Sequence, residues 1–265
     1  LIVNGDLIDG GRQPWEMLRL AYRLQQRAPQ HVIVLRGNHD DVMERGLRGD
    51  EEALENWLSI GGLQTLKDLV GPSETGPTSI DFGRDSQTGA LRVLARLTQR
   101  YPDFEQVLEW LAALPYAARI DGDTPIDIVH GSPDLSAAAF QQIAQERGNV
   151  EDGTGQLGVL WSRRWVDDPA RVYRHLQQTR AGYLVYGHTP ETRHPRHRDQ
   201  GVVRQVLSGV YNVNALPGKA PPGGAQAVLE FHVTPGGAVE RIHAVYGPNE
   251  LGLEDRSFAP LSVIG

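Results

Sequence analysis

The chain has 265 residues, of which 40% are hydrophobic and 22% charged, and its formal net charge at pH 7 is −7. This length and composition are typical of a globular protein with an ample core, and the negative charge gives no support to a protein whose main task is to bind nucleic acid. Because the sequence has no cysteine and no apolar run near the roughly 18 residues that cross a membrane, it excludes disulfides and thiolate metal ligands, and we expect a cytoplasmic protein with no membrane partner.

The first 37 residues predict a strand, a helix and a second strand. LIVNGD (1–6) is an apolar run that stops at Gly-Asp, and HVIVLRG (31–37) is a second apolar run. Between them, Pro14 suits the first turn of a helix whose apolar face continues to about Arg27. Two parallel strands joined by a helix form a βαβ unit.

The stretch 41–115 predicts helices instead of alternating strands. Its two helix-periodic segments, EEALENWLSIGGLQTLKDLV and ALRVLARLTQRYPDFEQVLEWLAALP, are separated by a loop at 71–89 that is rich in Gly, Pro and Ser. We therefore expect one domain over residues 1–265, with 41–115 as a helical insertion that caps a site on the sheet. An ordinary helical layer packed on the sheet is the alternative. We interpret Trp57 and Trp110 as core residues of these helices.

Strands and helices alternate again from residue 117. The expected elements are two strands in 117–131, helices near 136–147 and 169–180, a strand in 182–188, strands in 202–216 and a hairpin in 225–247. Asp168 precedes Pro169 and suits the N-cap of the second helix.

Four places in the sequence share one pattern, an apolar strand that ends in Gly beside a side chain able to bind metal. They are Gly5-Asp6 with Asp9, Gly37-Asn38-His39-Asp40, His130-Gly131 and Gly187-His188. Each of them alone is more typical of a turn, a cap or a hydrogen-bonded polar residue. Four in one chain are hard to attribute to chance. Because ligands of open α/β sheets bind outside the carboxyl ends of strands, we expect these side chains to converge.

These side chains predict a site for divalent metal. Asp6, Asn38, His130 and His188 offer a carboxylate, an amide oxygen and two imidazoles, which are ligands suited to Mn²⁺, Fe or Zn²⁺. Asp6 could bridge two metals, since a carboxylate has two oxygens. Two such metals clamp both sides of a displacement at phosphorus.

The side chain of His39 is a candidate proton donor. His39 follows the expected ligand Asn38 and would point its ring the other way. That direction places the imidazole for general acid work on the leaving oxygen, and Asp9 is expected to orient it.

The segments GDLIDGG, LRGNHD, VHGSPD and VYGHTP resemble the successive motifs of calcineurin-like metallophosphoesterases. Gly-His-Thr-Pro, WLSIGGLQTL (57–66) and GVLWSRR (158–164) are similar to the phosphoprotein phosphatase branch, which includes bacterial Ser/Thr phosphatases and symmetrical dinucleoside tetraphosphatases. The resemblance runs from residue 1 to about residue 218. It implies an α/β fold, in which a mixed β-sheet sandwich is flanked by helices in four α/β/β/α layers and carries a helical insertion.

The resemblance also implies roles for individual residues. Asp6 matches the bridging metal ligand, Asn38, His130 and His188 match the remaining ligands of one metal, His39 matches the proton donor and Asp9 its partner. Arg163 or Arg164 lies where the branch places a phosphate-binding arginine, and a solvated basic turn is the alternative for this segment. The implied cofactors are two divalent cations, with Mn²⁺ favoured and Fe and Zn²⁺ as alternatives, that activate hydroxide for phosphoester hydrolysis.

The sequence departs from the family pattern in two places. The family begins with Asp-x-His, whose residues hold the other metal, and this motif does not occur in the chain. We expect that the segment with this motif precedes Leu1, and the alternative is a chain that binds one metal. The branch reads Asp-Arg-Gly where this chain has Asp9-Gly10-Gly11, which removes one phosphate-binding arginine. Arg12 is a candidate substitute.

The expected activity is hydrolysis of a phosphomonoester, as in protein Ser/Thr phosphatases, on a phosphorylated protein, nucleotide or small molecule. A dinucleoside polyphosphate hydrolase is one alternative. A non-catalytic binding module on a decayed phosphatase fold is another, because of the missing motif and the missing arginine. A nuclease would use the same chemistry, but the net charge gives it no support.

Overall fold

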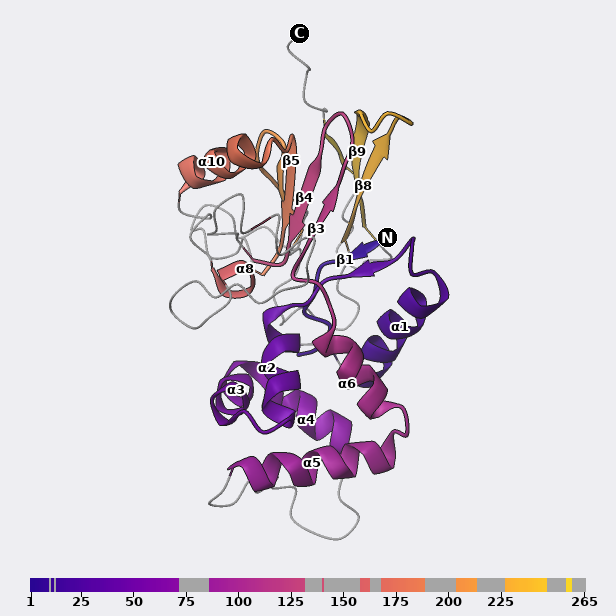
Figure 1. Cartoon of the computed structure of the whole chain (residues 1–265), viewed down its shortest axis with the longest axis vertical. Helices are drawn as coiled ribbons and strands as arrows, with labels where there is room; N and C mark the ends of the chain where they lie inside the picture. The colour runs from indigo at the N-terminus through magenta and orange to yellow at the C-terminus, as the bar shows by residue number, and fades with distance from the viewer. Residues whose placement is uncertain are drawn as a thin grey trace. The chain divides into compact units, whose positions relative to one another are not determined.

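A computed structural model of the chain describes residues 1–9, 11, 13–71, 86–131, 140, 158–162, 168–188, 204–213, 227–246 and 256–258. The chain divides into two units, residues 1–114 and residues 115–265, and each has its own strands and helices (Figure 1). No helix among these residues is long and apolar enough to cross a bilayer. The expectation of one domain with an inserted cap over 41–115 stays a prediction.

The first unit begins with the predicted βαβ arrangement. β1 (Ile2–Val3) and β2 (Ile33–Val34) pair in parallel. A parallel pair needs a crossover connection, which is α1 (Pro14–Arg27). Both strands are shorter than the apolar runs that predict them, and β1 ends before the backbone turns at Gly5, where φ is +74°.

One face of α1 is buried against aromatic side chains from the end of the same unit. The ring of Trp15 lies 4.6 Å from that of Tyr101 and 5.3 Å from that of Phe104, between ring centroids. Aromatic pairs at such distances add to the free energy gained from burial alone. They fix α1 against α6 (Phe104–Ala112).

The other elements that the structure describes in the first unit are helices and a turn. These elements are α2 (Asn38–Leu47), α3 (Glu51–Trp57), the kinked turn η1 (Leu58–Gly62), α4 (Leu63–Val70) and α5 (Ser86–Arg100). Gly61 has a φ of +141°, which interrupts the regular helix between α3 and α4. Trp57 and Trp110 are buried, as predicted.

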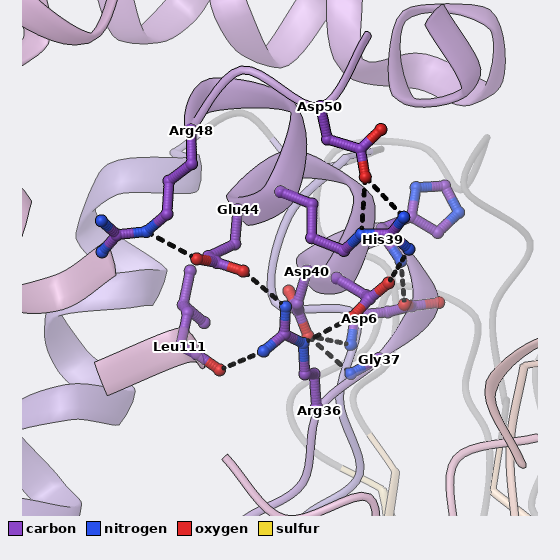
Figure 2. A network of polar contacts seen from close by, with 11 residues as sticks. Asp6, Arg36, Gly37, His39, Asp40, Glu44, Arg48, Asp50 and Leu111 are labelled. Atoms are coloured by element: carbon purple, nitrogen blue, oxygen red, sulfur yellow. Dashed lines mark hydrogen bonds and ion pairs between the residues drawn. The ribbon is translucent and has the colours of Figure 1, made fainter. Parts of the chain in front are cut away.

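Three charged side chains are buried together where β2 ends and α2 begins. The guanidinium of Arg36 lies 2.9 Å from Asp41 and 2.7 Å from Glu44, and it donates to the carbonyl oxygen of Leu111 at 3.1 Å (Figure 2). Burial raises the pKa of the Asp41 carboxyl, and the charge of Arg36 opposes this shift. The cluster ties the end of β2 to α2 and α6.

The second unit contains a mixed five-stranded sheet. Its strands are β3 (Ala117–Ile120), β4 (Ile126–Val129), β5 (Tyr183–Tyr186), β6 (Arg204–Leu207) and β7 (Val210–Asn212), in the order β3-β4-β5-β7-β6. The central strands β4, β5 and β7 are parallel, and β3 and β6 pair antiparallel at the edges. Buried central strands of this kind read as continuous apolar runs, which is why the sequence predicts them.

Helices and a second sheet complete the described part of this unit. They are α8 (Gly158–Trp161), α10 (Pro169–Thr179), and the antiparallel strands β8 (Ala227–Val233), β9 (Val239–Tyr246) and β10 (Arg256–Phe258). The predicted N-cap of α10 is confirmed, because Asp168 accepts the N–H of Ala170 at 3.1 Å. The helix predicted near 136–147 lies outside the described residues, apart from Phe140, which is buried.

Candidate functional site

The backbone around Asp6 adopts a conformation that most residues avoid. The φ angles of Asp6 and Asp9 are +54° and +59°. The left-handed region costs a non-glycine residue about 1–3 kcal/mol and persists only where the surroundings enforce it. Two such residues lie in the turn that follows β1, so contacts with the surrounding residues must enforce the conformation of this turn.

Two glycines let the loops that follow β1 and β2 approach each other. A Cβ on Gly5 would lie 2.5 Å from the backbone nitrogen of Gly37, and a Cβ on Gly37 would overlap Asp6. Glycine is therefore required at both positions. The approach brings the Asp6 carboxylate to the N-terminus of α2, where Oδ1 accepts the N–H of His39 at 3.2 Å.

The buried carboxylate of Asp40 joins the same two loops (Figure 2). It accepts the backbone N–H groups of Asp6 at 2.9 Å, Leu7 at 3.0 Å and Gly37 at 2.9 Å. Hydrogen bonds to a carboxylate are stronger than those between neutral groups. Asp40 was not predicted to have a role, although its position three residues after the N-cap Gly37 is a signal that could have found it.

His39 lies in the first turn of α2, and its ring contacts Asp9. The distance from His39 Nδ1 to Asp9 Oδ2 is 2.6 Å. Burial alone would lower the pKa of His39, but the hydrogen bond to Asp9 and the negative charges of Asp6 and Asp9 outweigh it, so the pKa is raised above 6.5. An imidazolium that donates Nδ1–H to Asp9 carries its other proton on Nε2, from which it can be given up.

In the second unit, His130 and His188 follow neighbouring parallel strands. His130 comes directly after β4, and Gly187 separates His188 from β5. The N–H of Gly187 donates to the carbonyl oxygen of His130 at 2.7 Å, and the two imidazole centroids are 5.3 Å apart. His188 has a φ of +62°, so its backbone is also in the left-handed region. The two imidazoles lie side by side.

The stretch that contains these residues matches a known protein family. The family model for calcineurin-like phosphoesterases matches residues 1–192. The chain belongs to the calcineurin-like phosphoesterase family. This confirms the fold class predicted from the sequence, the metallophosphoesterase fold with mixed sheets and helices, and it makes the protein a metal-dependent phosphoesterase.

Two solved phosphatase structures are similar to this chain. A protein serine/threonine phosphatase from Saccharomyces cerevisiae, with similarity to human phosphatase PP5, is 16% identical over 98% of this chain and 70% of that chain, with a TM-score of 0.49. The cold-active protein-tyrosine phosphatase of a psychrophilic Shewanella species is 17% identical over 97% of this chain and 68% of that chain, also with a TM-score of 0.49. At this distance neither likeness bears on the substrate. Among curated proteins, none matches the chain.

The side chains of each unit fit the divalent cations that a calcineurin-like phosphoesterase uses. Asp6 and Asn38 offer carboxylate and amide oxygens at the start of α2, and His130 and His188 offer two imidazoles at the ends of β4 and β5. This donor set suits Mn²⁺, Fe and Zn²⁺. Asp6 and His188 both have left-handed backbone angles. This also supports a functional site, since strained residues cluster at such sites.

The predicted phosphate-binding arginines lie outside the described residues, and two further residues contact Asp9. Arg163 and Arg164, predicted to bind phosphate, lie outside the described residues, as does Arg12. Their roles stay predictions. Trp57, predicted only as a core residue, and Thr65, for which no role is predicted, donate hydrogen bonds to Asp9. The signal that could have found them is WLSIGGLQTL (57–66), the segment that begins with Trp57 and includes Thr65.

Proposed function

We propose that this phosphoesterase hydrolyses phosphomonoesters with alkyl leaving groups, such as phosphoserine and phosphothreonine in proteins. The observation that carries the proposal is the contact of 2.6 Å between His39 Nδ1 and Asp9 Oδ2 at the N-terminus of α2. An alkoxide leaves phosphorus poorly unless it is protonated, so an alkyl ester benefits from a proton donor. The phosphate that leaves an anhydride is already a stable anion. A held proton donor therefore supports an ester substrate over a dinucleoside polyphosphate.

The proposed metal ligands are Asp6 and Asn38 from the first unit and His130 and His188 from the second. We propose that these residues would hold divalent cations, two in number, with Mn²⁺ favoured over Fe and Zn²⁺. Bound cations of this kind polarise phosphoryl oxygens and lower the pKa of a water molecule. Oδ1 of the Asp6 carboxylate accepts the N–H of His39 at 3.2 Å, which helps to orient this ligand.

The proposed reaction is a displacement at phosphorus. The oxygen of a water molecule forms a bond to phosphorus, and the bond between phosphorus and the leaving oxygen breaks. The leaving oxygen keeps the electron pair and takes the proton from Nε2 of His39, which yields the alcohol. The proton released by the water passes through solvent to His39. Arg163 and Arg164 are the proposed ligands of the phosphoryl oxygens.

A substrate panel with the full chain and added Mn²⁺ tests the substrate class. Its arms are a phosphoserine peptide, a phosphotyrosine peptide, diadenosine tetraphosphate, and mono- and diesters of nitrophenol. Turnover of the phosphoserine peptide well above that of the other natural substrates is the expected result. Preference for diadenosine tetraphosphate would replace the proposal with a nucleotide hydrolase, and absence of turnover and of bound metal would favour a non-catalytic module.

Single variants test the roles of the residues. Asp6→Asn and His188→Asn are expected to lower both metal content and turnover. His39→Gln is expected to lower turnover by about 10²–10⁴-fold with metal content unchanged, because general acid catalysis contributes that much. The matched control is His232→Asn, because the side chain of His232 is 41% exposed and lies in β8. Unchanged activity in Asp6→Asn and His39→Gln would contradict the assignment.

The role of the helices within 41–115 is part of this proposal. We propose that they cap the site and contribute to the choice of substrate. The cytoplasmic location stays a prediction.

A further inference from the structure

The Asp9 carboxylate is held by residues far away in the sequence. Oδ2 accepts the indole N–H of Trp57 at 3.1 Å, and Oδ1 accepts the hydroxyl hydrogen of Thr65. Trp57 and Thr65 are buried, and the side chain of Asp9 is only 4% exposed. With His39 on Oδ2, both carboxylate oxygens therefore have protein donors.

Two glycines shape the turn between α3 and α4 to fit this carboxylate. A Cβ on Gly61 would lie 3.3 Å from the Cβ of Asp9, and a Cβ on Gly62 would lie 2.5 Å from the indole ring of Trp57. A side chain at either position would displace Asp9 or Trp57. The turn is a kink at Gly61, where the φ of +141° lies outside the helical region. It allows the last residue of α3 and the third residue of α4 to reach the same carboxylate.

The contacts of Asp9 are geometrically linked. Oδ2 receives both Trp57 Nε1 and His39 Nδ1, so the direction of this oxygen decides the direction of the imidazole. The hydroxyl of Thr65 on Oδ1 stops the carboxylate from rotating. The left-handed φ of Asp9 leaves the residue dependent on such contacts for its position.

We propose that Trp57 and Thr65 are positioning residues that fix the Asp9 carboxylate, so that Asp9 orients His39 with Nε2 toward the leaving oxygen. The inference rests on the proposed function of His39 as proton donor. It adds that the segment from Trp57 to Thr65 is what adapts the enzyme to alkyl leaving groups. A segment that only packs against Asp9 would affect all substrates equally.

Thr65 allows a sharp comparison. Thr65→Val keeps the shape and removes the hydroxyl, whereas Thr65→Ser keeps the hydroxyl. Trp57→Phe removes the indole N–H and keeps an aromatic ring. The packing control is Leu69→Val, which removes a buried carbon from α4 and no side-chain hydrogen bond.

Kinetics on two leaving groups give the first readout. With Mn²⁺ present, Thr65→Val is expected to lower kcat on a phosphoserine peptide roughly tenfold or more, and on nitrophenyl phosphate less than about threefold, because only the poor leaving group needs the proton. KM should stay unchanged on both, and Thr65→Ser should restore kcat. Trp57→Phe should act in the same direction, and Leu69→Val should not discriminate between the substrates. In an Asp9→Asn background, Thr65→Val should add no further loss.

Proton NMR of the full chain gives a readout that needs no activity. The Nδ1–H of His39, donated to Asp9, should appear as a downfield resonance that disappears in His39→Gln. It should be lost or exchange faster with water in Thr65→Val, and it should persist in Thr65→Ser and Leu69→Val.

These outcomes separate the inference from the proposed function. Equal losses on both substrates, or an unchanged resonance in Thr65→Val, would overturn the positioning role. If the parent chain hydrolyses no ester but the resonance responds to Thr65→Val as expected, the positioning of His39 by Trp57 and Thr65 stands and the proposed function fails.

Discussion

The side chain of Asp40 accepts the backbone N–H of Asp6 at 2.9 Å, across 34 residues of sequence. The same carboxylate accepts the N–H groups of Leu7 and Gly37, so one buried acid links the loop after β1 to the start of α2. It acts on the backbone that carries the proposed metal ligands Asp6 and Asn38. Asp40 therefore supports the site without being proposed as a ligand.

Asp40→Asn is expected to weaken both the fold and metal binding. An amide NH₂ group would face backbone donors, and a buried donor left unsatisfied costs about 1–3 kcal/mol of unfolding free energy. Loss of such support typically weakens metal binding about 10–100-fold. Urea unfolding and Mn²⁺ titration measure the two effects. Glu55→Gln on the exposed face of α3 is the control, and Mn²⁺ affinity equal to that of the parent would contradict the role.

The buried cluster around Arg36 predicts a large loss of stability in Arg36→Met. This change leaves Asp41 and Glu44 buried without their shared cation. Removal of one partner from a buried ion pair costs about 3–5 kcal/mol. The control is Arg48→Met: Arg48 also contacts Glu44, at 2.7 Å, but its side chain is 38% exposed, so a loss below about 1 kcal/mol is expected. Chemical denaturation of both variants measures the loss of unfolding free energy. Equal losses in Arg36→Met and Arg48→Met would contradict the prediction that burial makes the Arg36 pairs more important.

Local signals and parallel pairing explain what the sequence could predict. The helix from Pro14 to Arg27 is predicted because Pro at the first turn and the apolar period are properties of that segment alone. His130 and His188 could be paired because each follows a buried strand, and neighbouring parallel strands end at one edge. The contact of His39 with Asp9 could be expected from the chemistry of imidazoles and carboxylates.

Contacts between distant segments explain what the sequence could not predict. The helical stretch was expected to begin at residue 41, but α2 begins at Asn38, because the close approach of Gly5 and Gly37 positions the first turn. The donors on Asp9 come from residues 48 and 56 positions away, and only the similarity of WLSIGGLQTL (57–66) to the phosphatase branch distinguishes Trp57 from an ordinary core residue. The directions of Trp57 and Thr65 follow from the kink at Gly61, whose φ of +141° a residue pattern does not reveal.

His175 and His188 make a matched pair of histidines in the second unit. His175 Nε2 lies 3.0 Å from the buried Asp127, and its ring packs edge-on against Phe140. His175→Phe is expected to lower the unfolding free energy by about 1–3 kcal/mol, because Asp127 loses one of its partners. Its metal content should equal that of the parent, whereas His188→Asn should lose metal. Elemental analysis beside thermal unfolding distinguishes them, and a loss of metal in His175→Phe would assign that histidine to the site.

Asp50 predicts how the stability of α3 depends on pH. It is the N-cap, accepts the N–H of Ala53 at 3.0 Å and pairs with Arg45. Partial burial would raise the pKa of Asp50, but the hydrogen bonds to Ala53 and Arg45 outweigh it, so the pKa lies below 3.8.

A lowered pKa in the fold means that Asp50 stabilises the protein above the pKa of the unfolded chain. This contribution is lost as the pH falls through the lower pKa of the fold. At neutral pH, Asp50→Ala should cost about 1 kcal/mol of unfolding free energy and Asp50→Asn less, since Asn keeps the capping oxygen. The difference between Asp50→Asn and the parent should shrink as the pH falls below the ordinary Asp value of about 4. Urea denaturation across this range measures it, and a difference that grows toward acid would contradict the sign of the shift.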